Sequence, residues 1–511
     1  FFTEECKATE GGTIMEEFFA GLVDTITNVN GAVNNFVWGI PMLILLVGTG
    51  ILMSVLTKFF QLSHIGHWFK NTIGGIFSDK HVTKHTDKDD KSISQFQSLC
   101  TALAATIGTG NIVGVASALI AGGPGAIFWM WIVAFFGMMT NYSENVLGIY
   151  YRRKNAKGEW CGGAMYYLKD GLGSYKGCKQ IGAILAVLFS IFCLLASFGI
   201  GNMSQVNSIS ANMEAAFDIP AAVTGIALMI LAALVIVGGL KRIASVTEKL
   251  VPFMAIAYII GALVIFFANI DQAGAIFSAI FKGAFGLKAV GGGIVGSGVK
   301  MALTWGMKRG VFSNEAGLGS SVMVHSNSNV KEPVRQGMWG IFEVCADTMI
   351  VCTLTAFSVL SSGLVDLETG AILSEASGSA LVGEAFATIF GSFGPMFIAL
   401  AILLFAFSTV LGWSHYGSKA WEYLFGTKST IAYKIVFILM IFIGATMNLS
   451  LAWDLSDTFN GLMAMPNLIG VLCLSPLVMK ITKNYVDRVL RNKYVKPLLS
   501  AFPDINDEHA E

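Results

Sequence analysis

Two glycine-rich interruptions of apolar sequence carry the residues that could bind a small charged molecule. The first is Ile107-Gly-Thr-Gly-Asn111, and the second is Arg309-Gly-Val-Phe-Ser-Asn-Glu-Ala-Gly-Leu-Gly-Ser320. A break in a membrane helix leaves backbone N–H groups at the start of one half and carbonyl groups at the end of the other. The N–H groups suit a carboxylate, and the carbonyl groups suit Na⁺ or an ammonium group. Two breaks can therefore bind an amino-acid zwitterion without a buried arginine.

A packing role for these glycines is the alternative, because small residues let membrane helices approach closely. Two breaks, each beside Asn, Ser or Thr, favour binding instead. Secondary transporters hold their substrate at such breaks, in matching positions of two repeats. The spacing of Gly108, Gly110 and Gly114 does not fit a dinucleotide-binding fingerprint.

Polar side chains within apolar stretches add further candidates, because each is costly at membrane depth. Asp347 could supply a carboxylate to a cation site, or it could form an internal salt bridge or a packing contact. Gln205 could reach a ligand at the middle of the membrane. Ser408 and Thr409 carry hydroxyls, which on helices often only bond back to a carbonyl one turn earlier. Glu315 flanks the second break, whereas Glu144 and Glu343 lie nearer one membrane face and favour structural pairing.

No set of residues indicates an enzyme. The sequence has no Walker A motif, no His-Glu-x-x-His motif and no Ser, His and Asp arranged as in a hydrolase. Its eight cysteines form no Cys-x-x-Cys motif and indicate neither a disulfide framework nor a zinc site. We therefore expect no catalysis and no cofactor.

Composition places these residues in a membrane protein. The chain has 511 residues, 54% of them hydrophobic and only 13% charged, where a soluble domain carries about a quarter. A soluble chain of this length would divide into several domains with charged surfaces, and the charges are too few for that. The formal net charge is zero, which argues against a nucleic-acid partner.

Charge-free runs predict eleven membrane-spanning helices, since about 20 apolar residues cross a bilayer. The predicted spans lie at 37–57, at two positions within 92–143 on either side of a turn at 121–125, and at 180–213, 219–240, 250–270, 289–307, 348–365, 385–418, 435–453 and 458–479. The seventh, 289–307, is short and glycine-rich, and we interpret it as a broken span.

Loop charges predict the orientation. Basic residues concentrate in 61–91, in 152–179 and after 480, whereas 363–384 is acidic and has no Lys or Arg. We therefore expect a multi-pass protein of the plasma (inner) membrane with its N-terminus outside and its C-terminus in the cytoplasm. An odd number of spans agrees with ends on opposite sides.

The two breaks then fall in the first helices of two five-helix groups that cross the membrane in opposite senses. The predicted fold is an all-α polytopic membrane protein with eleven transmembrane helices, in which one extra helix precedes a five-plus-five inverted repeat. The predicted parts are an extracellular N-terminal segment (1–36), the extra helix (37–60), the first repeat (92–270), the second repeat (287–482) and a cytoplasmic tail (483–511).

Five ordered segments resemble the alanine or glycine:cation symporter family. They are Thr106–Ala116, Gly123–Trp131, Arg309–Gly319, Glu343–Thr348 and Trp453–Gly461. The resemblance runs from about residue 36 to 485. It implies a leucine-transporter-like fold and transport of L-alanine, often glycine and sometimes D-alanine, with Na⁺ or occasionally H⁺. The expected partners are this substrate, the coupling ion Na⁺ and the lipid bilayer.

The resemblance also implies roles for individual residues. For the substrate these are Thr109, Gly110, Asn111, Gln205 and Trp413. For sodium they are Thr106, Gly108, Ser408, Thr409 and Asp347, where the choice of Asp347 is our own because the fold usually has an Asn near this place. A proton-coupled or sodium-coupled carrier of another small neutral amino acid is the alternative. A channel is a second rival class, although a channel would need a continuous polar pore.

Overall fold

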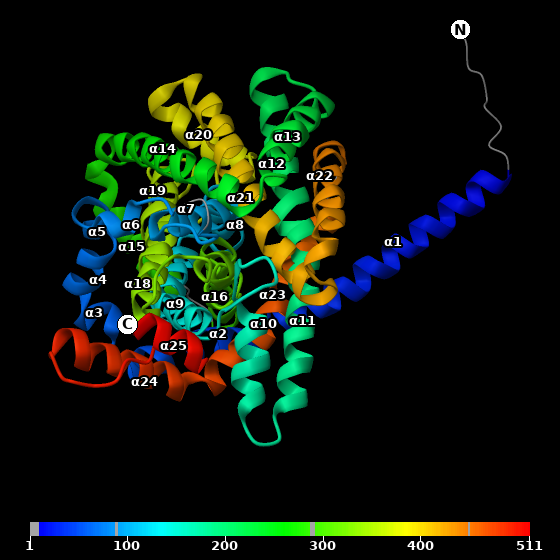
Figure 1. Ribbon diagram of the computed structural model, residues 1–511. Coiled ribbons are helices and arrows are strands. Elements are labelled where there is room, and N and C mark those ends of the chain that lie inside the picture. The colour runs from blue at the N-terminus through cyan, green and yellow to red at the C-terminus, as the bar shows by residue number, and fades with distance from the viewer. Residues whose placement is uncertain (1–9, 87–89, 287–291, 448–449, 511) are drawn as a thin grey trace, which may run out of the picture.

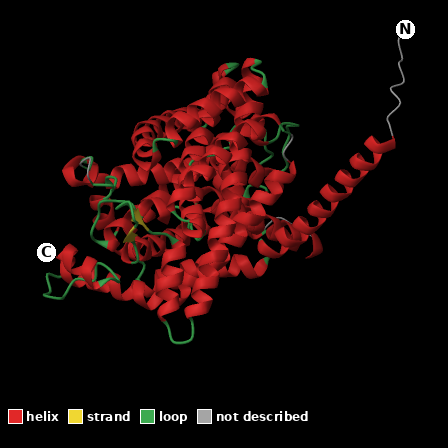
Figure 2. Ribbon diagram, turned by 45° about the vertical axis from the view of Figure 1, so that its right-hand side comes forward, coloured by secondary structure: helices red, strands yellow, loops and turns green. Residues whose placement is uncertain are grey.

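The computed structural model describes residues 10–86, 90–286, 292–447 and 450–510, and it is built almost entirely of helices (Figures 1 and 2). In the described residues the one sheet is a short antiparallel pair of β1 (Arg153–Lys154) and β2 (Trp160–Cys161). The all-α class predicted from the sequence is therefore confirmed.

The helices fall into three groups separated by the two breaks. Up to the first break lie α1 (Glu10–Val37), α2 (Ile40–Leu56), α3 (Phe60–Ser63), α4 (Ile65–Asn71), α5 (Ile73–Ser78), α6 (Lys80–Thr83) and α7 (Gln95–Thr106). From there to the second break lie η1 (Thr109–Asn111), α8 (Val113–Gly122), α9 (Gly125–Tyr150), α10 (Ala164–Tyr166), η2 (Tyr167–Gly171), η3 (Leu172–Ser174), α11 (Lys179–Phe198), η4 (Gly199–Met203), α12 (Ser204–Phe217), α13 (Ala221–Ile236), α14 (Gly239–Ala268), η5 (Ile270–Gln272), α15 (Ala273–Phe285) and α16 (Gly292–Asn314). After the second break lie α17 (Val322–His325), α18 (Pro333–Val344), η6 (Cys345–Cys352), α19 (Thr353–Leu360), α20 (Gly378–Phe390), α21 (Phe393–Phe425), η7 (Thr427–Ser429), α22 (Thr430–Thr446), α23 (Ser450–Cys473), α24 (Ser475–Tyr485), η8 (Val486–Leu490) and α25 (Pro503–Ala510).

Seven helices within the described residues are long and apolar enough to cross a membrane, and the number rises to nine if each of two bent pairs is one span. The bent pairs are α7 with α8 and α23 with α24. The 16-residue α13 and the 23-residue α16 occupy two further predicted spans. A membrane protein with many spans is thus confirmed, and the count of eleven stays a prediction.

Three predicted spans have other boundaries in the structure. The helix α16 runs unbroken to Asn314, so the break that we expected within 289–307 comes after it; residues 289–291 lie outside the described residues. The predicted span 385–418 begins inside α20, and the long helix α21 starts only at Phe393, after a turn at Gly391. Trp453 belongs to α23 and not to the tenth span.

Local sequence explains where the first broken helix begins and ends. At its start the Ser94 hydroxyl accepts a hydrogen bond from the Gln97 N–H (3.1 Å), and the Gln97 side chain accepts one from the Ser94 N–H (3.2 Å). This reciprocal cap satisfies two of the N–H groups that a helix start leaves free. At the far end Gly123 has φ +65°, a value that favours glycine, and Pro124 precedes α9.

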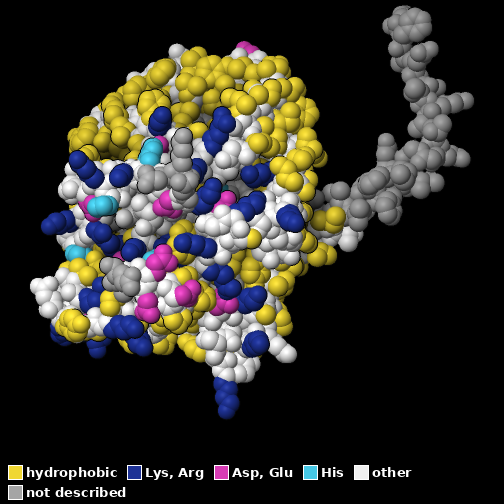
Figure 3. Space-filling model, viewed as in Figure 1, with side chains coloured by type: hydrophobic (Ala, Val, Ile, Leu, Met, Phe, Trp, Pro, Cys, Tyr) yellow, Lys and Arg dark blue, Asp and Glu magenta, His cyan; other side chains and the backbone are white. Residues whose placement is uncertain are grey.

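Three sets of helices pack closely against one another. The helix α9 packs against both α16 and α18, α7 packs against α14 and α21, and α13 packs against α22. Hydrophobic side chains form an apolar band over the upper part of the face seen in Figure 3, and many apolar side chains elsewhere on the helices are exposed. Leu234 on α13 and Leu439 on α22 are among the exposed apolar side chains. In Figure 1, α1 projects away from this body of helices.

Candidate substrate and cation site

The first break opens the backbone between α7 and α8, which meet at an angle of 60°. Gly108 follows the end of α7 and is extended, with φ −136° and ψ −148°. The Asn111 side-chain oxygen accepts the Gly108 N–H at 2.9 Å, and the Gln205 side-chain oxygen accepts the Thr109 N–H at 3.2 Å. The break therefore exists as predicted, and two of its N–H groups are held by Asn111 and Gln205.

The second break starts where α16 ends. Glu315 takes a left-handed conformation with φ +57°, and Gly317 and Gly319 have φ +93° and +73°. The Asn314 side-chain oxygen accepts the Ala316 N–H at 3.0 Å. This resembles the first break, because at each one an Asn side chain accepts a backbone N–H that the interrupted helix leaves without a partner.

Asp347 joins the two breaks. One carboxylate oxygen accepts the Asn111 Nδ2–H at 2.7 Å, and the other accepts the hydroxyls of Ser313 (2.8 Å) and Thr348 (2.8 Å). All four side chains are fully buried. Within the described ranges no Lys, Arg or His pairs with this carboxylate. The salt-bridge role that the sequence left open is thus not found, and Asp347 instead holds one residue from each break.

Asp347 lies in η6, an eight-residue π-helical stretch between α18 and α19. The wider turns of a π-helix leave carbonyl groups free for other partners. Here the Thr348 carbonyl accepts the Thr353 hydroxyl at 3.2 Å. The irregular helix therefore sets the position of the carboxylate that faces the two breaks.

The helix α21 approaches the first break closely. The hydroxyl oxygens of Ser408 and Thr409 lie 3.3 and 3.0 Å from the Ala104 carbonyl oxygen. The Phe405 carbonyl is the other acceptor within reach of each hydroxyl, at 2.8 and 3.1 Å, so each shares its one proton between the two carbonyls. A Cβ on Gly108 would lie 2.4 Å from the Thr409 hydroxyl oxygen. The close approach explains why this position is glycine, and it places two hydroxyls and a carbonyl within reach of one another.

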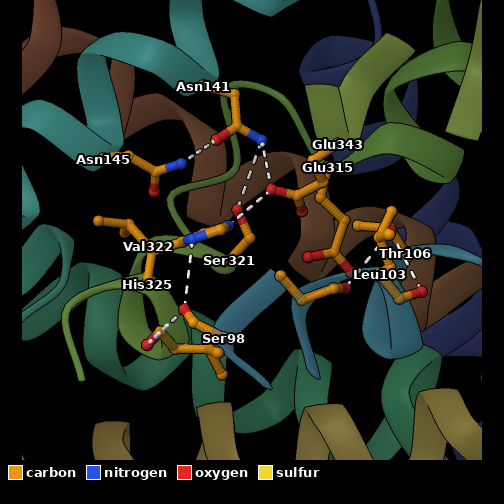
Figure 4. Close-up of polar contacts among 12 residues, drawn as sticks. Ser98, Leu103, Thr106, Asn141, Asn145, Glu315, Ser321, Val322, His325 and Glu343 are labelled. Carbon is orange, nitrogen blue, oxygen red and sulfur yellow. Dashed lines mark hydrogen bonds and ion pairs between the residues drawn. The ribbon is translucent and has the colours of Figure 1, made fainter. Parts of the chain in front are cut away.

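Thr106 does not join this group. Its hydroxyl bonds back to the carbonyls of Ala102 (3.3 Å) and Leu103 (3.4 Å) within α7 (Figure 4). This is the ordinary role of a helical hydroxyl. Its predicted part in a sodium site therefore has no contact that supports it.

Trp413 is attached to the second break. Its indole N–H donates to one Glu315 oxygen at 2.8 Å, and the other Glu315 oxygen accepts the Ser320 hydroxyl at 2.5 Å. Trp413 also covers Gly201, where a Cβ would lie 2.4 Å from the Trp413 side chain. The sequence marked Glu315 only as a neighbour of the break. Because an acidic side chain at membrane depth needs a hydrogen-bond donor, the sequence could have predicted that Glu315 has a partner. Nothing in the sequence identifies Trp413 as that partner.

A cavity of about 150 Å³ opens beside the first break. Thr109, Phe312 and Trp453 line it, and the Thr109 hydroxyl is buried without a hydrogen-bond partner in the described residues. Arg309 and Asp457 also line it, with their charged atoms 3.7 Å apart. A buried hydroxyl without a partner beside a cavity is a candidate contact for a ligand.

Sequence reasoning missed the ionic wall of this cavity. Lys308 lies 2.7 Å from Asp457, and Arg309 stacks over Phe312 with its guanidinium 5.4 Å from the ring centre. Two basic residues late in a spanning helix need an acidic partner there. That requirement could have identified Asp457 in α23.

A second polar network is centred on His325 and Glu343 (Figure 4). His325 and Glu343, both fully buried, are joined by a hydrogen bond of 2.9 Å. Gln336 donates to the other His325 ring nitrogen at 2.5 Å, and Asn141 donates to Glu343 at 3.3 Å. The internal pairing expected for Glu343 is therefore confirmed, and the network ties α17 to α18 and α9.

Comparison with known proteins identifies close relatives. The profile of the sodium:alanine symporter family matches residues 23–497. The sodium/alanine symporter AgcS of Methanococcus maripaludis is 45% identical over 91% of this chain and 98% of its own length. A putative sodium/proton-dependent alanine carrier of Bacillus subtilis is 35% identical over 89% of this chain and 91% of its own. A probable sodium/glutamine symporter of the same species is 36% identical over 90% and 91%.

Proposed function

The chain belongs to the sodium:alanine symporter family, and we propose that it imports L-alanine together with Na⁺. We further propose that it accepts glycine and D-alanine, since a pocket that admits a methyl side chain also admits a hydrogen, and a small pocket discriminates weakly by one methyl. The observation that carries the proposal is the pair of helix breaks that Asp347 joins through Asn111 and Ser313.

The substrate site of this proposal lies at the first break. The carboxylate of the bound amino acid contacts backbone N–H groups near Gly110 and Asn111, where the start of α8 supplies a partial positive charge. The ammonium group of the amino acid contacts backbone carbonyls of the second break. Thr109 offers a hydroxyl beside the cavity that has no recorded partner in the described residues. We assign contact with the methyl group to Gln205, which accepts the Thr109 N–H, and to Trp413, which bonds to Glu315 of the second break.

The cation site of this proposal lies between α7 and α21. The hydroxyls of Ser408 and Thr409 and the Ala104 carbonyl form a set of neutral oxygen ligands, which suits a monovalent cation because no buried charge remains when it leaves. A second cation position lies at Gly108, Asn111 and Asp347. Thr106 would join the first position only if its hydroxyl left the Ala102 carbonyl.

The packing of two groups of helices supports alternating access. In this proposal α7 to α9 and α16 to α19 move together, since α9 packs against both α16 and α18. They rock against α11 to α13, α21 and α22, in a five-plus-five inverted repeat that the first span precedes. The basic loops lie in the cytoplasm and the N-terminus outside, by the positive-inside rule.

The sodium gradient is sufficient to drive uptake. One charge crossing ~100 mV contributes about 2.3 kcal/mol, and a tenfold Na⁺ gradient contributes about 1.4 kcal/mol. Together they can hold a substrate gradient of roughly a few hundred-fold. One Na⁺ in each cycle is therefore enough for scavenging.

The decisive experiment measures radiolabelled L-alanine uptake into proteoliposomes under an inward Na⁺ gradient, and again with K⁺ replacing Na⁺ at fixed pH. We expect uptake only with Na⁺, and competition by excess glycine and D-alanine. Sodium-dependent uptake of L-glutamine that alanine does not inhibit would refute the assignment of alanine.

Proton coupling is the second candidate, and Asp347 is the observation that favours it. A carboxylate that is buried without a basic partner can carry a proton across the membrane. A pH gradient would then drive uptake in the absence of Na⁺, and Asp347→Asn would abolish this uptake. Sodium-dependent uptake that is unaffected by a pH gradient would exclude it.

A further inference from the structure

A basic pocket lies apart from the two breaks, on the face that carries the basic loops. Its cavity measures about 280 Å³ and lies between the turn that joins α13 to α14, the end of α21 and the start of α22. The basic side chains that line it are Lys91, Lys157, Lys241, Lys419, Lys434 and His415. In Figure 3, Lys and Arg side chains gather below the apolar band.

The charges in this basic pocket are not balanced from within. Glu159 and Glu422 also line it, and both face Lys419, at 3.8 and 2.9 Å. Lys241 donates to the Asp90 carbonyl at 2.5 Å. Lys434, which is half-buried, lies near Glu159 but has no ion pair recorded in the described part of the chain. An excess of lysines over carboxylates around one cavity attracts an anion with several acceptor oxygens.

A buried imidazole adds an independent indication of a ligand. His415 is only 5% exposed, lines the cavity and has a ring nitrogen, Nε2, without a hydrogen-bond partner in the described residues. Buried polar atoms are nearly always paired, with protein, water or ligand. A neutral imidazole at this place can accept a hydrogen bond from a hydroxyl, and a protonated one can donate to a phosphate oxygen.

The surroundings of the basic pocket indicate where such an anion comes from. The two helices that end at its rim carry exposed apolar side chains directly beside it. They are Leu234 (57% exposed) and Val237 (61%) at the end of α13, and Ile431 (55%) and Ile435 (54%) at the start of α22. A soluble anion gains nothing from this apolar surface, whereas a lipid can place its headgroup in the basic pocket and its acyl chains along these helices.

We infer that the basic pocket binds the phosphate headgroup of an anionic phospholipid such as phosphatidylglycerol. Lys157 and Lys434 contact the phosphate, and His415 and Glu422 face the glycerol hydroxyls. Because α21 contributes His415 and also carries Ser408 and Thr409, a bound lipid contacts the helix of the proposed cation site. The inference does not depend on which amino acid is transported.

Native mass spectrometry of the detergent-purified full chain tests this inference. Dioleoyl phosphatidylglycerol is titrated against dioleoyl phosphatidylcholine, whose choline group the lysines would repel. We expect the first lipid to bind in preference, and the double variant Lys157→Gln/Lys434→Gln to weaken that binding by about tenfold or more. The matched control Lys480→Gln/Lys483→Gln removes the same charge from exposed positions on α24 and is expected to bind as the unmodified chain does.

Two further experiments test whether a loss of binding reflects a loss of charge or a loss of folding, and whether the pocket binds a lipid or a soluble phosphate. The variant Lys157→Arg/Lys434→Arg keeps the charge, and we expect it to keep phosphatidylglycerol binding. Equal binding by the double Gln variant and the unmodified chain would overturn the inference. Binding of glycerol 3-phosphate, which lacks acyl chains, at the same strength as the lipid would overturn the lipid assignment.

Discussion

At the scale of single residues, the site depends on side chains that hold broken backbone in place. Asn111 accepts from one N–H of the first break and donates to Asp347. Its small amide therefore does two things that a hydrophobic side chain of similar size cannot do. The arrangement also explains why a carboxylate without a basic partner is stable in the middle of the protein, because three donors surround it.

Replacing Asn111 by Ala tests this role. The variant leaves the Gly108 N–H and one Asp347 oxygen without their partners, at a cost of about 1–3 kcal/mol each. We expect alanine uptake below about a tenth of the unmodified rate, with the same elution on size exclusion. The control Asn212→Ala removes an amide that only bonds back to Ser208 and should transport normally. Normal uptake by Asn111→Ala would remove Asn111 from the site.

Replacing Thr409 by Ala tests the proposed cation site. Loss of one oxygen ligand should raise the Na⁺ concentration for half-maximal uptake by about fivefold, the equivalent of about 1 kcal/mol. The control Ser190→Ala removes a buried hydroxyl that bonds back to Ala186 within α11 and should leave the Na⁺ dependence unchanged. If Thr409→Ala slows uptake without altering its Na⁺ dependence, α21 does not bind the cation.

Residues at the site were predictable from the sequence to different degrees. Gly108, Asn111, Gln205 and Thr409 meet at the first break, whereas Trp413 contacts Glu315 of the second break. The partner of Trp413 was not predictable, because Glu315 lies 98 positions away and its direction depends on a left-handed backbone. Thr106 was assigned from its position in a motif, but its hydroxyl turns back into its own helix.

At the scale of elements, close approach of backbones decides which glycines matter. A Cβ on Gly108 would lie 2.4 Å from the Thr409 hydroxyl, whereas one on Gly114 would lie 3.9 Å from its nearest neighbour, Arg309. Both glycines belong to the same motif, so the sequence alone ranks them equally. Likewise the glycine-rich segment at the start of α16 predicts a break from its sequence, yet the described part of it is helical.

The pair Gly108→Ala and Gly114→Ala tests this distinction. Overpacking at Gly108 should cost about 1–3 kcal/mol of stability and abolish Na⁺-dependent uptake, because α7 and α21 can no longer meet. Gly114→Ala meets only ordinary contact and should transport within about twofold of the unmodified chain. Thermal unfolding in detergent and proteoliposome uptake measure the two effects. Equal behaviour of the two variants would show that the close approach is unimportant.

At the scale of the whole molecule, two polar networks join helices that are far apart in the chain. The ionic group of Lys308, Arg309 and Asp457 borders the cavity and joins α16 to α23, and the network around His325 and Glu343 ties α17 to α18 and α9. Alternating access requires each side to open while the other is closed. A membrane protein with many spans was predictable from composition, and the need of buried charges for a partner was predictable from single residues. Which residue forms each cross-connection was not predictable, since the partners lie far apart in the chain.

Replacing Glu343 by Ala tests the contribution of the second network. His325 and Asn141 would lose their shared acceptor in a fully buried place, and removal of one member of a buried pair costs about 3–5 kcal/mol. We expect a marked fall in the midpoint of thermal unfolding. Glu375→Ala, at an exposed position of the loop before α20, should have no effect. A similar midpoint for both variants would show that the network is not structural.

The π-helical stretch from Cys345 to Cys352 has a consequence for how insertions and deletions act in this chain. One additional residue in a helix turns everything beyond it by about 100°, since an α-helix has 3.6 residues per turn. Deleting one residue within η6 would let α18 and α19 join as a regular helix, but it would also rotate Asp347 relative to one of them. The register of this helix is therefore part of the site. Substitutions in η6 at positions other than Asp347 and Thr348 should be tolerated far better than any change in its length.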